Sequence, residues 1–125
     1  MRLSPIERDD LNDQQRTVLE AIESGPRGNS QPGIGMMGPF GAWVRAPTVG
    51  QPIQALGEAI RFNTSLPPNV QEVAICTVGV HHQSRFEFSA HRALAIKAGV
   101  AERALDQLTA GEHPDFSGDE QLSYS

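Results

Sequence analysis

Cysteine is almost missing from this sequence of 125 residues, which has only Cys76. A single thiol excludes an intramolecular disulfide, a CxxC redox pair and a metal site built from several thiolates. Cys76 lies in the apolar run VAICTVGV, where we expect a small buried hydrophobic residue rather than a nucleophile or a redox sensor. We therefore expect a function that does not use cysteine chemistry.

Basic residues and long apolar runs are also in short supply. Ten Lys and Arg stand against fifteen Asp and Glu, and the formal net charge is -5. This balance disfavours binding to nucleic acid or to an anionic membrane surface, because both need a basic footprint. No apolar run reaches the roughly 18 residues of a transmembrane helix, and the opening MRLSPIERDD is too acidic for a secretory leader. We expect a cytoplasmic protein.

The length suits one domain with one core, so we expect a single domain over residues 1–125. In its first half, Asn12 and Gln15 predict a capping box before a helix that ends near Gly25. Apolar residues at spacings of four, three and four then predict an amphipathic helix over about 48–62, carried by Val49, Ile53, Leu56 and Ile60. Pro52 fits this helix only within its first turn.

The second half contains three further helical patterns. Asn69 and Glu72 predict a capping box before VQEVAICTVGVHH, whose apolar residues on nearly every side indicate a central, buried helix. Ser84 and Glu87 predict another capping box, before the strong helix former RFEFSAHRALAIKA. A short helix is expected over about 102–109. These patterns together predict an all-α fold.

Two stretches depart from these patterns. Residues 25–41 hold six of the twelve glycines and three of the nine prolines, which predicts a mobile loop that serves as a lid. The match of GIGMMG to the dinucleotide-binding pattern GxGxxG is rejected, because SGPRGNSQP before it cannot be a strand. Near the end, Ser117 and Glu120 predict a capping box with only five residues after it. We expect a C-terminus that is truncated or is completed by another chain.

Polar residues gather around the two central helices: Glu72, His81, His82, Ser84, Glu87 and His91. Glu87 and His91 are four residues apart and share one face of a helix. A carboxylate beside an imidazole fixes the tautomer and suits proton transfer near neutral pH. Capping would also explain Ser84 and the two glutamates, and a helix C-terminus would explain His81 and His82. His91, in mid-helix, is the hardest to explain by structure alone.

The segment from Glu72 to Gly99 resembles the signature region of the carboxymuconolactone decarboxylase family, within the AhpD-like superfamily. Decarboxylase-like members are also similar to the flanking segments, SPIERDDLNDQQRTVLEAIESGPRG, GPFGAWVRAPTVGQPIQALGEAIRFNTSLPP and AGVAERALDQLTAGEHPDF. The resemblance covers almost the whole chain. It implies an AhpD-like helical bundle, here without the usual C-terminal helices, and a homo-oligomer such as a trimer or hexamer.

The peroxidase branch of this family carries two thiols in CxxC between a Glu and a His. At the matching spacing this sequence has Ser84 and Glu87 in place of the thiols, and His91 as the His. Because that chemistry requires a thiolate and a resolving disulfide, we expect no dithiol peroxidase. The thiol-free branch has the pattern H-x5-E-x3-H, which His81, Glu87 and His91 resemble.

The resemblance implies a cofactor-free acid–base decarboxylase or related lyase that acts on a small carboxylated, lactone-like or aromatic-derived compound. In this hypothesis His91 transfers a proton, Glu87 orients and charges it, and Glu72 or His81 completes the relay. The expected substrate-binding residues are Ser84, Arg85 and His82, with Arg85 or Arg92 as the anchor for a carboxylate.

Two alternatives remain open at this point. The first is an enzyme that binds iron or zinc, because imidazole and carboxylate ligands are offered by His81, His82, Glu87 and His91. The second is a non-catalytic oligomeric protein that binds a small ligand on the same fold, because every candidate residue also has a structural role available to it.

Overall fold

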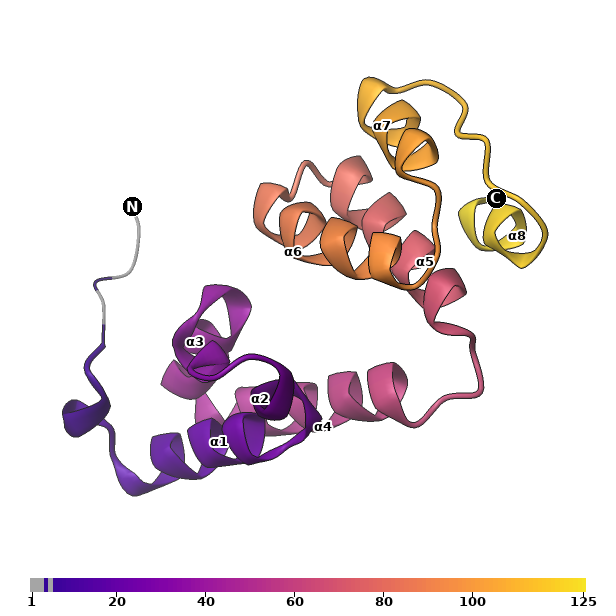
Figure 1. Cartoon of the computed structure of the whole chain (residues 1–125). Helices are drawn as coiled ribbons and strands as arrows, with labels where there is room; N and C mark the ends of the chain where they lie inside the picture. The colour runs from indigo at the N-terminus through magenta and orange to yellow at the C-terminus, as the bar shows by residue number, and fades with distance from the viewer. Residues whose placement is uncertain (1–3, 5) are drawn as a thin grey trace. The chain divides into compact units, whose positions relative to one another are not determined.

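The computed structural model describes residue 4 and residues 6–125. These residues form helices and connecting turns without a strand, which confirms the all-α prediction (Figure 1). In chain order the elements are η1 (Arg8–Asp10), α1 (Asp13–Ser24), α2 (Pro26–Ser30), η2 (Ile34–Met36), α3 (Gly38–Arg45), α4 (Pro47–Phe62), α5 (Pro68–His81), α6 (Arg85–Lys97), α7 (Glu102–Ala110) and α8 (Asp119–Tyr124). Among the described residues, no helix is both long enough and apolar enough to cross a membrane.

The chain divides into two compact units, Met1–Thr64 and Ser65–Ser125, called here unit 1 and unit 2. Unit 1 contains the elements from η1 to α4, and unit 2 contains α5 to α8. Each has a cluster of buried apolar side chains of its own. The expectation of a single domain over the whole chain stays a prediction.

Helix α1 starts as its sequence predicts. The Asn12 side chain accepts a hydrogen bond from the Gln15 amide, and the Gln15 side chain accepts one from the Asn12 amide, each at 3.0 Å. Both bonds satisfy amides that the first turn of a helix leaves without partners. The apolar face of α1 is then buried in the unit 1 cluster, whose buried members are Leu11, Val18, Leu19, Ile22 and Val44.

The predicted loop over residues 25–41 is wrong, because this stretch contains α2, η2 and the start of α3. Its glycines allow close packing on α1. A Cβ added to Gly28 would lie 1.8 Å from the Glu23 carbonyl oxygen, and one added to Gly35 would lie 2.4 Å from Leu19 Cδ1. The glycines that suggested a loop therefore allow a close approach to α1 instead. No strand precedes GIGMMG in the described residues, consistent with rejecting a dinucleotide site.

Helix α4 has nearly the predicted bounds but not the expected orientation. Gly50 and Gln54 are its buried residues, whereas its apolar residues are exposed: Val49 by 56%, Ile53 by 40%, Leu56 by 62% and Ile60 by 55%. A Cβ on Gly50 would lie 2.1 Å from the Trp43 carbonyl oxygen, so close contact with α3 selects this inner face. Pro52 lies inside the helix, beyond the first turn in which it was expected.

Unit 2 is built on α5 and α6, which the short turn over residues 82–84 joins (Figure 1). Helix α5 also contacts α7 and α8. Its Val73 and Cys76 are fully buried in the unit 2 cluster, as expected for a central helix. The other buried members are Ala95, Val100, Ala104, Leu105, Leu108 and Phe116.

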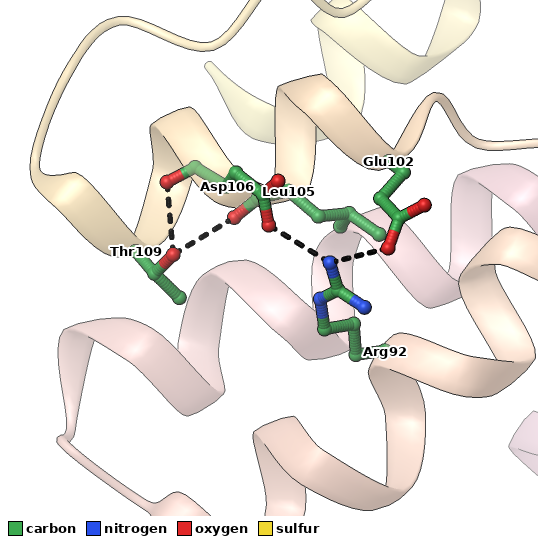
Figure 2. Close-up of polar contacts among 5 residues, drawn as sticks. All are labelled: Arg92, Glu102, Leu105, Asp106 and Thr109. Carbon is green, nitrogen blue, oxygen red and sulfur yellow. Dashed lines mark hydrogen bonds and ion pairs between the residues drawn. The ribbon is translucent and has the colours of Figure 1, made fainter.

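Arg92 connects α6 to α7 on the surface of unit 2. Its Nη2 donates to Glu102 Oε1 and to Asp106 Oδ1, each at 2.8 Å (Figure 2). The Thr109 hydroxyl donates to the carbonyl oxygens of Leu105 and Asp106, one turn earlier in α7. Hydrogen bonds to the two carboxylates raise the pKa of Arg92. Arg92 thus fixes the start of α7 against α6.

Three of the four predicted capping boxes are wrong. Helix α5 begins after Pro67, so Asn69 lies inside it and donates to Glu120 Oε1 at 2.8 Å. Ser84 is the N-cap of α6 but its side chain makes no capping bond, and α8 begins after Gly118 rather than Ser117. The carboxylates that were expected to cap contact other side chains instead. Two of them, Glu72 and Glu87, contact the same imidazole.

Candidate acid–base site

His91 forms its shortest polar contact with a buried carboxylate from the neighbouring helix. His91 Nδ1, on α6, lies 2.7 Å from Glu72 Oε2, on α5. The Glu72 side chain is 8% exposed and that of His91 is 13% exposed. A carboxylate at this depth is costly without a partner, and a charge-assisted hydrogen bond supplies one. Inside unit 2, Glu72 and His91 therefore each supply a hydrogen-bond partner for the other's side chain.

The other ring nitrogen of His91 faces a second carboxylate. Glu87 Oε1 lies 3.5 Å from His91 Nε2, and the Glu87 side chain is 39% exposed. The separation of four residues along α6 places them on one face, as the sequence predicted. His91 is thus held between one buried carboxylate and one at the surface.

This arrangement gives the two nitrogens of His91 different roles. An ionised carboxylate only accepts hydrogen bonds, so when Glu72 is ionised the proton of this hydrogen bond lies on Nδ1 of His91. In the neutral imidazole, Nε2 then has the lone pair. A proton taken up at Nε2 lies beside Glu87, and the resulting cation has a carboxylate on each side. Such a ring can accept a proton and return it at one defined atom.

His81 and His82 do not join this group. Both are exposed at the end of α5, and their rings contact each other edge to face with centroids 4.9 Å apart. Neither ring forms a hydrogen bond or an ion pair with another described residue. The predicted relay therefore includes Glu72, Glu87 and His91, and the structure gives no contact that would bring His81 into it.

The alternative metal site is not assembled. Within the described part of the chain, no group of three or more His, Cys, Asp or Glu side chains is placed to hold a metal ion. The four ligands proposed from the sequence lie in two places. His81 and His82 lie at the surface at the end of α5. Glu87 and His91 lie on α6, where His91 also contacts Glu72. The physical reason is that the ring nitrogens of His91 already face carboxylates.

A pocket of about 330 Å³ lies at the α5–α6 turn. Two of the three predicted substrate-binding residues, Ser84 and Arg85, line it, and His82 does not. The other lining residues, which the sequence did not indicate, are Gly79, Val80, Gln83, Phe88 and Thr109. Among these, Gln83 has a φ of 53°, a left-handed conformation that is uncommon outside glycine. None of Glu72, Glu87 and His91 lines this pocket.

Arg85 is the cation that this pocket offers. It is exposed, and no carboxylate of a described residue forms an ion pair with it. Arg92, the other candidate anchor from the sequence, is occupied by Glu102 and Asp106 (Figure 2). The choice between the two arginines, which sequence spacing left open, therefore favours Arg85.

Cys76 lies one turn after Glu72 in α5 and is fully buried. Burial, and to a smaller extent the nearby charges of Glu72 and Glu87, raise the pKa of its thiol to about 12. The thiolate is the reactive form of cysteine, so at neutral pH this thiol is inert. The prediction of a buried cysteine is confirmed.

Comparison of the chain with protein-family models, with curated proteins and with solved structures finds no match. The resemblance to the carboxymuconolactone decarboxylase family consequently rests on the residues of the sequence alone.

Proposed function

We propose that unit 2 catalyses proton transfer without a cofactor, as a decarboxylase or related lyase acting on a small carboxylated, lactone-like or aromatic-derived compound. The observation that carries the proposal is the bracketing of His91 by Glu72 at 2.7 Å and Glu87 at 3.5 Å. The resemblance of residues 72–99 to the decarboxylase family supplies the reaction class.

The roles follow from this geometry. When the carbon–carboxylate bond breaks, its electron pair stays on the substrate as an enolate-like anion and CO₂ leaves. His91 Nε2–H delivers a proton to that carbon, and water then restores the proton on Nε2. Glu72 is a positioning residue that keeps the other proton on Nδ1, and Glu87 stabilises the imidazolium before the transfer. Glu72 and Glu87 act through His91 rather than on the substrate.

Arg85 and Ser84 would bind a second carboxylate of the substrate. Arg85 is six residues before His91, which is about 9 Å along the axis of α6. The anchoring carboxylate and the reacting carbon therefore belong to different parts of the molecule. This spacing favours compounds with two acidic groups, or with one acidic group on a ring that spans the distance.

The experiment incubates the full chain with a panel of small γ-lactones and aromatic acids that bear one or two carboxylates. CO₂ release is measured, together with deuterium incorporation at carbon in D₂O by NMR. We expect turnover with at least one compound, and a loss of at least about a hundredfold in His91→Asn. The matched control is His113→Gln, because His113 is an exposed histidine outside the site. Unchanged turnover in His91→Asn would contradict the proposal.

A second candidate function is binding of a small carboxylate without catalysis. The observation that favours it is that the pocket contains Arg85 but not His91. It predicts that members of the same panel bind, that binding is weakened by Arg85→Gln, and that no compound is turned over. Calorimetry on the same samples separates it from the first proposal.

A further inference from the structure

Three helices of unit 2 end with the same backbone motif. After α5, the amides of Gln83 and Ser84 donate to carbonyl oxygens in the last turn of the helix, at 3.0 and 2.8 Å. The ends of α6 and α7 repeat this pair of hydrogen bonds around Gly99 and Gly111. The motif requires one residue with a left-handed backbone just after the helix. Gln83 is that residue after α5, with a φ of 53°, where the other two helices have glycine at 99° and 74°.

Glycine is the ordinary residue for this conformation. It adopts a left-handed backbone without steric cost, whereas the Cβ of another residue comes too close to a carbonyl oxygen. Lack of space does not explain Gly99 and Gly111, because a Cβ added to either would have no neighbour within 4 Å. Their φ angles therefore explain them. In the described part of the chain, Gln83 is the one residue other than glycine with a positive φ.

The turn itself does not need the side chain of Gln83. Both hydrogen bonds that end α5 are donated by backbone amides, and a glycine would form them equally well. The side-chain amide of Gln83 is exposed and forms no hydrogen bond with another described residue. Nothing inside unit 2 therefore offsets the strain. Backbone strain of this kind is concentrated at functional sites and ligand clamps.

Gln83 differs from the two glycines in its surroundings. It lines the pocket of about 330 Å³ at the α5–α6 turn, and neither Gly99 nor Gly111 does. Val80 and Phe88 also line this pocket, and both pack against the unit 2 cluster, which holds these two apolar walls in place. The volume suits a ligand with one ring, since a cavity of about 150 Å³ holds benzene.

The polar side chains of the pocket offer different chemistry. Arg85 carries the only charge among the lining residues, and a guanidinium pairs with a carboxylate. The Thr109 hydroxyl already donates within α7. The carboxamide of Gln83 has two N–H donors and no charge, so it suits an uncharged oxygen of the ligand.

We propose that Gln83 is a specificity-determining residue of this pocket, whose side-chain amide donates a hydrogen bond to a carbonyl oxygen on the ring of a bound carboxylate. This role accounts for a glutamine at a position where glycine would be more stable. The inference rests on the proposed function, from which it takes the carboxylate anchored by Arg85. It adds that the ligand carries an uncharged oxygen and that recognising this oxygen lowers the stability of unit 2.

The first test asks whether stability and binding change in opposite directions. Gln83→Gly should raise the midpoint of thermal unfolding by about 2–4 °C, because the strain is removed and the backbone hydrogen bonds remain. Gly99→Gln is the matched control, since it places the same side chain in the same conformation outside the pocket. It should lower the midpoint by a similar amount and leave binding unchanged.

The second test compares two acids of equal charge and ring size. One is γ-carboxy-γ-butyrolactone, and the other is cyclopentanecarboxylate, which lacks the ring oxygen and the carbonyl. NMR titration of the full chain measures both dissociation constants. We expect the wild type to bind the lactone acid about three- to tenfold more tightly, the effect of one hydrogen bond, and Gln83→Gly to lose this preference. Arg85→Gln should weaken the binding of both acids alike.

Any of three results would overturn the proposal. One is a Gln83→Gly variant that is no more stable than the wild type, which would give the glutamine a structural role. Another is a preference for the lactone acid that survives in Gln83→Gly. The third is a wild type that binds neither acid, or both equally well. Turnover by His91 is measured separately, so catalysis can fail while Gln83 still selects the lactone acid, and the reverse.

Discussion

The two units bury charge in opposite ways. Unit 2 places one carboxylate, Glu72, beside His91 at the edge of an otherwise apolar cluster. Unit 1 places Arg27 against the polar side of α4 and leaves the apolar side of that helix exposed. Burial lowers the pKa of the Arg27 guanidinium, and Glu58 opposes that shift. Apolar periodicity therefore locates a helix without fixing which of its faces turns inward.

The largest expected difference concerns thiol reactivity in the two units. Because the pKa of Cys76 is raised from 9.0 to about 12, its thiolate fraction at pH 8 is lower by about a thousandfold. Gln14→Cys adds an exposed thiol to α1 in unit 1. We expect iodoacetamide to alkylate that thiol at least about a thousandfold faster than Cys76 in the folded protein, as followed by peptide mass spectrometry. Similar rates would show that the core of unit 2 is open.

Leucine truncation compares a buried position of unit 2 with an exposed position of unit 1. Leu105 is fully buried in unit 2 and Leu56 is 62% exposed in unit 1. Leu105→Ala should lower the free energy of unfolding by about 2–5 kcal/mol, measured by urea denaturation. Leu56→Ala should cost less than about 0.5 kcal/mol in dilute protein.

Equal costs for these two substitutions would contradict the exposed orientation of α4. The sequence pattern alone favours equal costs, because it places Leu56 on the apolar face of an amphipathic helix. The same measurement therefore distinguishes the buried orientation of Leu56 that the sequence predicts from its exposed orientation in the structure.

The buried carboxylate of unit 2 should matter more than its partner at the surface. Glu72→Gln keeps the shape of the side chain but removes the charge facing His91, and we expect a loss of about 1–3 kcal/mol. Glu87→Gln, at a 39% exposed side chain, should change stability by no more than about 0.5 kcal/mol. Thermal unfolding at neutral pH checks both. A larger loss for Glu87→Gln would reverse the assignment of the principal partner of His91.

The smallest effects are expected on the surface, where the two units are alike. Arg92 bridges Glu102 and Asp106 in unit 2, and Arg8 pairs with Glu23 in unit 1. Arg92→Ala and Arg8→Ala should each cost at most about 1 kcal/mol, because exposed ion pairs contribute little. Unfolding at low and at high salt provides the check, since screening should remove most of either effect. A cost above 2 kcal/mol for one of them would give it a structural role beyond pairing.

Much of the fold was predictable from local signals. The Asn12 capping box, the helices near 48–62 and 102–109 and the burial of Cys76 follow from caps, periodicity and composition. The orientation of α4 was not predictable in this way, because contacts of Gly50 with the Trp43 backbone and of Gln54 with Arg27 determine it. Both contacts join residues from different helices, and no pattern within α4 reports them.

The candidate site was predictable in part. Spacing along one helix gave the contact between Glu87 and His91. The shorter contact, from His91 to Glu72, joins two helices and was expected only as one option, since capping explained Glu72 equally well. The pocket residues Gln83 and Thr109 had no signal in the sequence, because a left-handed turn and the packing of α7 bring them to the pocket.

The proposed proton transfer requires a proton at Nδ1 of His91, and the ¹⁵N chemical shifts of the histidine side chains test this most directly. Above the titration of the ring, we predict that His91 shows a protonated Nδ1 and an unprotonated Nε2, with His113 as the exposed reference in the same spectrum. A substitution of Glu72 by Ala should abolish this preference. A neutral His91 protonated at Nε2 in the wild type would contradict both the pairing with Glu72 and the proposed proton transfer.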